Sequence, residues 1–485
     1  MLSSLLLSLS KNKIHRNGSL TMIADCSRRQ AFFFRRTDVL SGLVCRFANP
    51  FQSLRSLCSA SDETDHTSTL VQLCSKRYYI IRDSIHGGSF LPGIACPYGP
   101  LGTELRKSIL DKWWTSVVMC RPQVFGISTL HLTRTTPVAA ERTLQLVDRT
   151  ALDHILNQDS LSWEQTREAL RKLLDDSLPL RTNLLQGALE QYLPSLELVN
   201  RRLPFGLAET GVCYQTWQGQ TNVPESPVEV TQASLVWFCS PRTSSQWLDY
   251  WARQRLQWWR KFALGPSSFS CSDVADGEEG ERVARGVKIL YRFPWGSETL
   301  ETLWNLGDVE LLQTHKGSRA KLQCRDGRKS VVPHVISVCG NIDRGVLAYL
   351  HNSLQEMKKT DSKQRLLKRK VLKLHPSLAP VKVALDMGRG PTMELRQVCE
   401  GLLQELLEGG ISTWPGYLET MQSSMEQLIT KYDEMGVLFT IMITDNTLEN
   451  GLVQVRSRDT TIKETMHISE VKMFLTKYIS ASENA

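Results

Sequence analysis

Short strand-like runs between residues 204 and 355 most strongly constrain the fold of this chain. Runs such as ASLVWF (233–238) and SVVPHVISV (330–338) are rich in the β-branched and aromatic residues that suit strands. Neighbouring parallel strands need a crossover of a dozen or more residues, usually a helix, and the runs are not spaced as such repeats. The pattern therefore favours an α+β fold with an antiparallel sheet flanked by helices over a doubly wound fold.

Two amphipathic helices are expected beside this sheet. The segment GPLGTELRKSILDKWWTSVV (99–118) places a Gly/Pro turn before apolar residues at spacings of four: Leu101, Leu105, Ile109 and Trp113. The segment QWLDYWARQRLQWWRKFA (246–263) interleaves tryptophans with Arg253, Arg255, Arg260 and Lys261. Stacking on nucleic acid is one reading of that mixture. Helical spacing of the apolar residues favours tryptophans in the core and charges on a solvated face.

A leucine-rich helical segment over about residues 139–202 reads as an insertion. Its apolar stripes must be buried, either against a second copy of the chain or against its own body, and the sequence leaves both choices open.

The last module is expected over residues 371–485, after a basic stretch and a boundary near residue 370. VKVALDM (381–387) reads as a buried strand, and PTMELRQVCEGLLQELLEGG (391–410) reads as a helix with Pro near its start and two Gly at its end. Further strand and helix patterns follow. The order indicates a compact α/β domain.

The first sixty residues have the composition of a mitochondrial presequence, rich in Arg, Ser and Leu and poor in acids. They hold nine Lys or Arg against Asp25 and Asp38. A secretory signal is the alternative, but here the charges follow the apolar run instead of preceding it. Residues 61–70 read as a linker, with order beginning near Leu70. No run reaches the roughly eighteen apolar residues of a membrane span, so none is expected.

The formal net charge of the whole chain is +8, and most of it lies in the presequence. Nucleic-acid binding by the body would therefore rest on local basic clusters, which hold phosphates without base specificity. The candidates are Arg325, Arg328, Lys329, Lys358, Lys359, Lys363, Arg365, Lys368, Arg369 and Lys370. An ordinary solvated linker remains the alternative.

Twelve cysteines are spread along the chain without a CxxC pair. Structural zinc is not expected, nor is a disulfide framework. No metal and no cofactor is predicted.

Five blocks in order resemble bacterial-type glycyl-tRNA synthetases of class II: GPLGTELRKSILDKWW, PFGLAETG, KILYRFPWGSETLE, NIDRGVLAYL and VLKLHPSLAPVKVAL. The resemblance implies a class II synthetase-like domain over residues 61–370, with the helical insertion inside it. It also implies an anticodon-binding-type α/β domain over residues 371–485.

The catalytic residues of that family are missing. By resemblance, Gln215 stands where the second motif has its phosphate-binding Arg, and Trp217 stands where it has Glu. Ser234, Val236 and Ser337 occupy positions that are acidic in the family, whereas Asp343 and Arg344 of the third motif are kept. A neutral amide cannot replace a guanidinium on a phosphate, so a degenerate site and no enzymatic activity are expected.

Longer segments, including ETLWNLGD, CRDGRKSVVP and GISTWPGYLETMQSSMEQL, resemble the accessory subunits of vertebrate mitochondrial DNA polymerases. That resemblance implies a homodimer formed through the helical insertion, binding of double-stranded DNA and of a catalytic subunit, greater processivity, and a place in the matrix nucleoid. Exposed aromatics and Arg are enriched in interface hot spots, so Trp414, Tyr417 and Arg456 are hypothetical polymerase contacts. A working glycyl-tRNA synthetase and a tRNA-binding relic are the alternatives.

Overall fold

The computed structural model describes residues 32–35, 63–81, 97–133, 144–158, 162–217, 226–276, 284–316, 319–360, 366–388, 392–419 and 424–484. The chain divides into two compact units: residues 1–41 with 141–180, and residues 42–140 with 181–485. Apart from residues 32–35, the predicted presequence lies outside the described residues.

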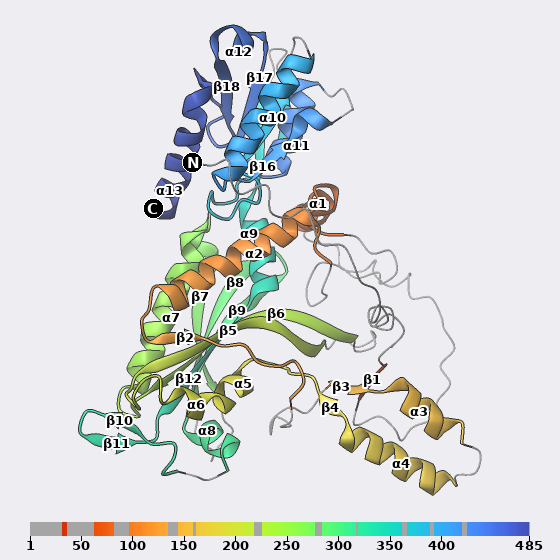
Figure 1. The fold of residues 1–485 in the computed structure, drawn as a ribbon, viewed down its shortest axis with the longest axis vertical. Helices are drawn as coiled ribbons and strands as arrows, with labels where there is room; N and C mark the ends of the chain where they lie inside the picture. The colour runs from red at the N-terminus through yellow and green to blue at the C-terminus, as the bar shows by residue number, and fades with distance from the viewer. Residues whose placement is uncertain are drawn as a thin grey trace, which may run out of the picture. The chain divides into compact units, whose positions relative to one another are not determined.

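A seven-stranded sheet forms the centre of the larger unit (Figure 1). Its strand order is β2-β5-β6-β12-β9-β8-β7, and every neighbouring pair is antiparallel except β2 with β5. The bounds are β2 Val124–Gly126, β5 Phe205–Trp217, β6 Ser226–Cys239, β7 Phe269–Asp276, β8 Ala284–Phe293, β9 Gly296–Gly307 and β12 His334–Asn341. The antiparallel sheet predicted from strand spacing is confirmed.

Both faces of this sheet are buried, because successive side chains of a strand point to opposite sides. In β6, Leu235 and Trp237 belong to one core cluster, whereas Val236 and Phe238 belong to another. The first cluster includes residues of α2 (Pro100–Trp114), α7 (Ser244–Lys261) and α9 (Ile342–Ser353). The second includes residues of α5 (Leu185–Glu190), α6 (Tyr192–Ser195) and α8 (Val309–Thr314).

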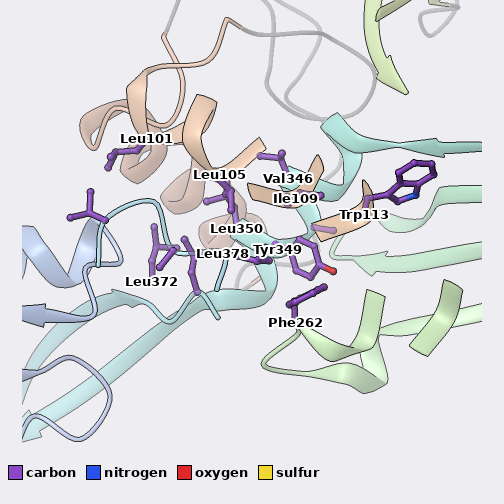
Figure 2. Close-up of a cluster of buried hydrophobic side chains, with 14 of the residues drawn as sticks. Leu101, Leu105, Ile109, Trp113, Phe262, Val346, Tyr349, Leu350, Leu372 and Leu378 are labelled. Carbon is purple, nitrogen blue, oxygen red and sulfur yellow. The ribbon is translucent and has the colours of Figure 1, made fainter. Parts of the chain in front are cut away.

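Helix α2 carries the expected apolar stripe, and a π-helical turn, Thr115–Met119, follows it. Pro100 lies in its first turn, where a missing N–H is harmless. Figure 2 shows the stripe beside Val346 and Leu350 of α9. The buried stripe residues are Leu101, Leu105, Ile109 and Trp113.

Helix α7 confirms that its tryptophans are core residues and corrects one expectation about its charges. Trp251 and Trp259 are buried, and so is Arg255 between them, although a solvated position was expected. Position 255 is four residues from each tryptophan and therefore shares their face of the helix. Its Nε donates to both carboxylate oxygens of Glu301 on β9, at 2.9 and 3.1 Å.

The C-terminal domain contains a five-stranded sheet in the order β16-β15-β17-β18-β19. Strand β15 (Val383–Met387) pairs in parallel with β16 (Thr413–Pro415) and with β17 (Phe439–Ile443). Strand β18 (Leu452–Ser457) pairs antiparallel with β17 on one side and with β19 (Lys463–His467) on the other. Strands β15 and β17 are apolar and largely buried, as central parallel strands usually are. The helices are α10 Thr392–Glu408, α11 Met425–Glu434, α12 Asp445–Asn450 and α13 Val471–Asn484.

Helix α1 (Glu63–Lys76) replaces most of the expected linker. The prediction of an unstructured segment over residues 61–70 is wrong from Glu63 onward. Leu70, Leu73 and Cys74 are buried in the large core cluster, and this packing orders a first turn that is polar in sequence.

The body and the C-terminal domain are joined through buried polar contacts at the end of α11. Arg458 donates hydrogen bonds to the carbonyl oxygens of Leu372, Leu374 and Gly436 at 3.1, 2.9 and 3.0 Å. Leu372 ends β14 (Leu366–Leu372), the second strand of a hairpin with β13 (Leu354–Thr360). One guanidinium therefore ties the last strand of the body to the C-terminal domain.

The smaller unit contains a three-stranded sheet, β1-β3-β4, and two helices. Its elements are β1 Phe32–Arg35, β3 Leu144–Val147, α3 Arg149–Leu156, α4 Trp163–Asp176 and β4 Leu178–Pro179. The predicted insertion over residues 139–202 is therefore divided between the units. Helices α5 and α6 belong to the larger unit, because Leu189 and Tyr192 pack in the same cluster as Phe205.

Among the described segments, no helix combines the length and the apolar character that crossing a bilayer would require.

Replacing Arg458 with Met should destabilise the protein by about 3 kcal/mol, because three buried carbonyl oxygens lose their charged donor. Urea unfolding followed by circular dichroism measures this loss. The control is Arg396→Met: Arg396 forms an exposed pair with Glu400 within one helix, and such pairs contribute about 0.5 kcal/mol or less. Equal losses for the two variants would contradict the assigned role of Arg458.

Candidate functional site

The sheet face that carries Val236 and Phe238 changes from apolar to polar along its strands. Ser234 follows Val236 by strand alternation, and Ser337 of β12 is paired directly with Val236. The apolar part lies in the core cluster that includes residues of α5, α6 and α8. Farther along β6 the same face carries Ser234 and Gln232, and there it opens into a pocket.

The pocket has a volume of about 340 Å³, and most of the residues that line it have polar side chains. Its walls come from β5, β6, β9 and β12 and from the chain just before and within α5. The lining residues are Asn183, Leu185, Gln215, Gln232, Ser234, Thr299, Leu300, Glu301, Thr302, Trp304, Ser337, Cys339 and Asn341. The structure thus brings together Gln215, Ser234 and Ser337, three of the predicted degenerate-site residues.

The pocket lining offers no free charge. Glu301 is its one acidic residue, and the Glu301 carboxylate accepts hydrogen bonds from Arg255 and, at 2.6 Å, from Trp259 Nε1 on α7. Burial raises the pKa of the Cys339 thiol to about 12, so the thiol is neutral at physiological pH. The remaining polar groups in the lining are hydroxyls and amides.

A buried ion pair lies on the same face of β5 as Gln215. Arg181 Nη1 donates to Glu209 Oε1 at 3.0 Å, and both side chains are 4% exposed. A Cβ at Gly211 would come within 2.3 Å of the Arg181 guanidinium, so glycine lets this arginine cross the strand. Arg181 Nε also donates to the Val212 carbonyl at 2.8 Å. The charges of this pair are therefore already satisfied within the protein.

Gln215 lies near the end of β5 and is exposed, and its Nε2 donates to the Thr182 carbonyl at 3.3 Å. Trp217 is the last residue of β5 and pairs with Ser226, and its side chain lies outside the described residues. Val236 is buried in the apolar part of the face.

Asp343 and Arg344 at the start of α9 both have structural partners. Asp343 accepts hydrogen bonds from the Thr231 backbone N–H at 2.6 Å and from the Tyr98 hydroxyl at 2.9 Å. Arg344 pairs with Glu298 at 3.1 Å. These contacts connect α9 to the segment before α2 and to strands β6 and β9.

Arg325, Arg328 and Lys329 lie in a short exposed hairpin of β10 (Cys324–Asp326) and β11 (Lys329–Val331). Gly327 makes its turn with a φ of +61°. The hairpin is bonded to a second basic segment, because Arg325 N donates to the Arg201 carbonyl at 2.6 Å and Leu203 N donates to the Arg325 carbonyl at 3.2 Å.

The two segments together form one surface, the basic rim, composed of Arg201, Arg202, Lys321, Arg325, Arg328 and Lys329. All six are exposed, and none forms an ion pair with another described residue. The one carboxylate in the hairpin, Asp326, is paired with Arg242 at 3.4 Å. The sequence analysis missed Arg201 and Arg202, since only the backbone pairing of distant segments brings them to the hairpin, and it also missed Lys321, which shortly precedes β10.

The second basic cluster lies on the β13–β14 hairpin. Lys358 is directly opposite Lys368 in the ladder. The side chains of Lys358, Lys359, Lys363, Arg365 and Lys368 lie outside the described residues. Arg369 pairs with the buried Asp433, and Lys370 Nζ donates to Thr69 Oγ1 at 3.1 Å. Burial, followed by the nearby Arg456 guanidinium, lowers the pKa of Arg369 to about 10, so it stays charged.

The three hypothetical polymerase contacts do not share one exposed surface. Trp414 is half-buried, stacks on Tyr78 with ring centroids 6.4 Å apart, and donates to Glu419. Tyr417 is buried, and so is Arg456, which binds Asp433 through two hydrogen bonds of 3.0 and 3.3 Å. The expectation of exposed side chains is therefore wrong for Tyr417 and Arg456. Arg456 lies on the half-buried strand β18, and its side chain is buried because its partner carboxylate, Asp433, lies on α11.

Within the described residues, no group of three or more His, Cys, Asp or Glu is arranged to hold a metal ion.

Comparison with known proteins identifies the family. The chain is 54% identical over 420 residues to DNA polymerase subunit gamma-2 of Bos taurus, covering 86% of each protein. It is 49% identical to the mitochondrial DNA polymerase subunit gamma-2 of Xenopus laevis over 86% of this chain and 88% of that one. The chain belongs to the DNA polymerase subunit gamma-2 family.

The same comparisons confirm the fold class. Glycine–tRNA ligase of Thermus thermophilus is 26% identical to the chain, covering 84% of this chain and 97% of that protein. A crystal structure of prolyl-tRNA synthetase from Cryptosporidium parvum superposes with a TM-score of 0.58 at 13% identity, covering 87% of this chain and 79% of that one. A family model described as the anticodon binding domain matches residues 381–478. The fold is thus class II synthetase-like, followed by an anticodon-binding-type domain.

Proposed function

We propose that this protein is a non-catalytic accessory subunit of the mitochondrial replicative DNA polymerase, which binds the catalytic subunit and double-stranded DNA and raises processivity. The observation that carries the proposal is the high identity to DNA polymerase subunit gamma-2 over most of the chain. A factor that holds polymerase and duplex together slows dissociation through effective concentration and needs no chemistry of its own.

The basic rim supports the DNA-binding part of the proposal. Its cations are exposed, come from two bonded segments and have no carboxylate partner among the described residues. Such a surface contacts phosphates and carries no base-reading chemistry. Duplex binding without sequence preference is what a processivity factor requires.

The smaller unit supports formation of a homodimer. Helices α3 and α4 contain no buried residue in the single chain, and their outward apolar side chains include Leu156 and Trp163, which are 57% and 74% exposed. An amphipathic pair of helices whose apolar residues are exposed or only partly buried is well suited to pack on a second copy.

Location in the mitochondrial matrix, within the nucleoid, completes the proposal. The Xenopus laevis relative is named as mitochondrial, and residues 1–60 have a presequence-like composition.

Primer extension with the catalytic subunit tests the proposal directly. We expect longer products per binding event when the purified chain is added, and no nucleotide incorporation by the chain alone. Unchanged product length at moderate salt, under single-encounter conditions, would exclude the processivity function.

Glycine-dependent ATP–pyrophosphate exchange should be undetectable, and Gln215→Arg alone should not restore it. Adenylate formation needs several phosphate and amino-acid contacts together, whereas Ser234 and Ser337 provide no charge. Exchange above background in the unmodified protein would favour the glycyl-tRNA synthetase alternative. Competition between tRNA and primer-template DNA for the protein tests the alternative of a tRNA-binding relic. That alternative predicts that tRNA displaces the primer-template DNA.

Arg201→Ala combined with Arg202→Ala should weaken duplex DNA binding and make the negative slope of log K against log salt shallower by about 2, because each lost phosphate contact removes about 0.9 from its magnitude. Fluorescence anisotropy over a salt series measures both quantities. The matched control is Arg253→Ala on the exposed side of α7, which should leave the slope unchanged. An unaltered slope in the double variant would remove these arginines from the DNA surface.

Trp163→Glu combined with Leu170→Glu should convert the dimer to a monomer, because two carboxylates would have to be desolvated in the interface. Size-exclusion chromatography with light scattering reports the mass. Lys172→Glu, on the opposite side of α4 by helical spacing, serves as the charge-matched control and should remain dimeric. A dimer that survives the double change places the subunit interface elsewhere.

A further inference from the structure

The last residue of α1 and the segment after it contact both the body and the C-terminal domain, and we call residues 76–81 the latch. On the body side, the Tyr78 carbonyl accepts from the Leu101 N–H at 3.0 Å, and the Tyr79 carbonyl accepts from the Gly99 N–H at 3.0 Å. The first N–H groups of a helix have no partner within it, and no side chain caps this end of α2. The latch is therefore bound to the start of α2.

Two glycines of the body let the latch come this close. A Cβ at Gly99 would lie 2.3 Å from the Tyr78 carbonyl oxygen, and a Cβ at Gly102 would lie 2.0 Å from that of Tyr79. A larger residue at either position would push the backbone of the latch away from α2. The body thus holds the latch through its backbone, which leaves the side chains available for the C-terminal domain.

On the side of the C-terminal domain, Arg77 binds the end of α11. Its Nη2 and Nε lie 2.6 and 2.7 Å from Glu434 Oε2, and both side chains are 13% exposed. Glu434 is the last residue of α11, where the negative end of the helix dipole disfavours a carboxylate. The following residue is bound too, because the Tyr79 hydroxyl donates to the Met435 carbonyl at 3.0 Å. The end of α11 is therefore stabilised by the latch.

Tyr78 makes a second contact with the C-terminal domain, on a different element. Its ring stacks on Trp414 of β16, with centroids 6.4 Å apart and planes 20° apart. The Tyr78 backbone is left-handed, with a φ of +60°, which a non-glycine residue adopts only where its surroundings hold it. The latch thus contacts both α11 and β16, and two contacts fix the angle of a domain better than one.

Other contacts between the body and the C-terminal domain meet at the same end of α11. Arg369 of β14 pairs with Asp433, and Arg458 donates to the carbonyl oxygens of Gly436 and Leu372. These partners on α11 and just after it directly flank, in sequence, the two residues that the latch binds. Without the latch, these contacts would hold the domain within one small region, about which it could turn.

We propose that Arg77 and Tyr78 are positioning residues, which keep the C-terminal domain at one angle to the body and thereby couple the polymerase to DNA. The proposal rests on the proposed accessory function, with duplex on the basic rim of the body and the polymerase on the C-terminal domain. Linked binding sites raise effective concentration only where the geometry lets both be occupied. A domain that turns freely would keep both affinities and lose processivity.

Arg77→Met combined with Tyr78→Asn tests the latch in the full chain alone. Methionine removes the charge, and asparagine removes the ring while accepting a left-handed backbone. Hydrogen–deuterium exchange in residues 76–81 and 434–437 should become about tenfold faster or more, because the local contacts open more often. Arg253→Met, which removes an exposed charge from α7, is the control and should exchange like the unmodified chain. Unchanged exchange in the double variant would overturn the proposal.

Primer extension under single-encounter conditions tests the coupling. The double variant should shorten products about threefold or more, while its affinities for duplex DNA and for the catalytic subunit change by less than about twofold. Unchanged product length despite faster exchange would overturn the positioning role, and so would an equal loss of affinity. If the unmodified chain itself fails to lengthen products, the accessory function is wrong. Exchange in the chain alone would still decide whether the latch holds the domain.

Charge reversal separates the ion pair from a general loss of folding. Arg77→Glu and Glu434→Arg should each speed exchange at the end of α11 and shorten the products. Their combination should restore both quantities to within about twofold of the unmodified chain, because the pair forms again with its charges exchanged. A combination that behaves no better than the single changes would overturn the role of this pair.

Discussion

Alternation of side chains along β6 and β12 is the constraint on which the rest of the body depends. One set of positions, including Leu235 and Trp237, enters the core cluster shared with α2, α7 and α9, and the other set faces the opposite side. On that opposite side, Val236 and Phe238 are packed in a second core, while Ser234 and Gln232 lie in a pocket. A register shift of one residue would place serines in the core and tryptophans in the pocket, so the register is strongly determined.

Two groups of charged residues in the larger unit have different roles. The first group is buried, and each of its arginines is paired with a carboxylate: Arg255, Arg181 and Arg456. These pairs connect secondary-structure elements and add little to the electrostatic potential at the protein surface. The cations of the basic rim are exposed and unpaired among the described residues. The first group makes it costly to separate the elements that it joins, because breaking a buried pair leaves an uncompensated charge. The second group is available to phosphates.

Periodicity alone predicted the antiparallel sheet, the buried stripe of α2 and the buried tryptophans of α7. The polar character of the pocket came from a family resemblance, which pointed to Gln215, Ser234 and Ser337. Sequence patterns gave wrong predictions where the burial or the position of a residue depends on a partner far away in the sequence. The sequence predicts that Arg255 and Arg456 are exposed to solvent. Both are buried, because each forms a hydrogen bond with a buried carboxylate, that of Glu301 or of Asp433. Arg201 and Arg202 carry no signal of their own, because a backbone pairing more than a hundred residues away places them beside Arg325.

A synthetase-like fold can lose the charges of its site without losing its stability, and the geometry of this sheet explains why. The buried ion pair of Glu301 extends to α7, on the side of the sheet away from Ser234 and Ser337, and the Arg181–Glu209 pair is satisfied within its own wall. Uncharged side chains at Gln215, Ser234 and Ser337 are therefore compatible with the packing of the sheet. Catalytic groups are commonly a source of unpaired polarity and strain, so their removal does not oppose folding. The same fold can therefore support functions that depend on other surfaces, which is how one scaffold comes to serve unrelated roles.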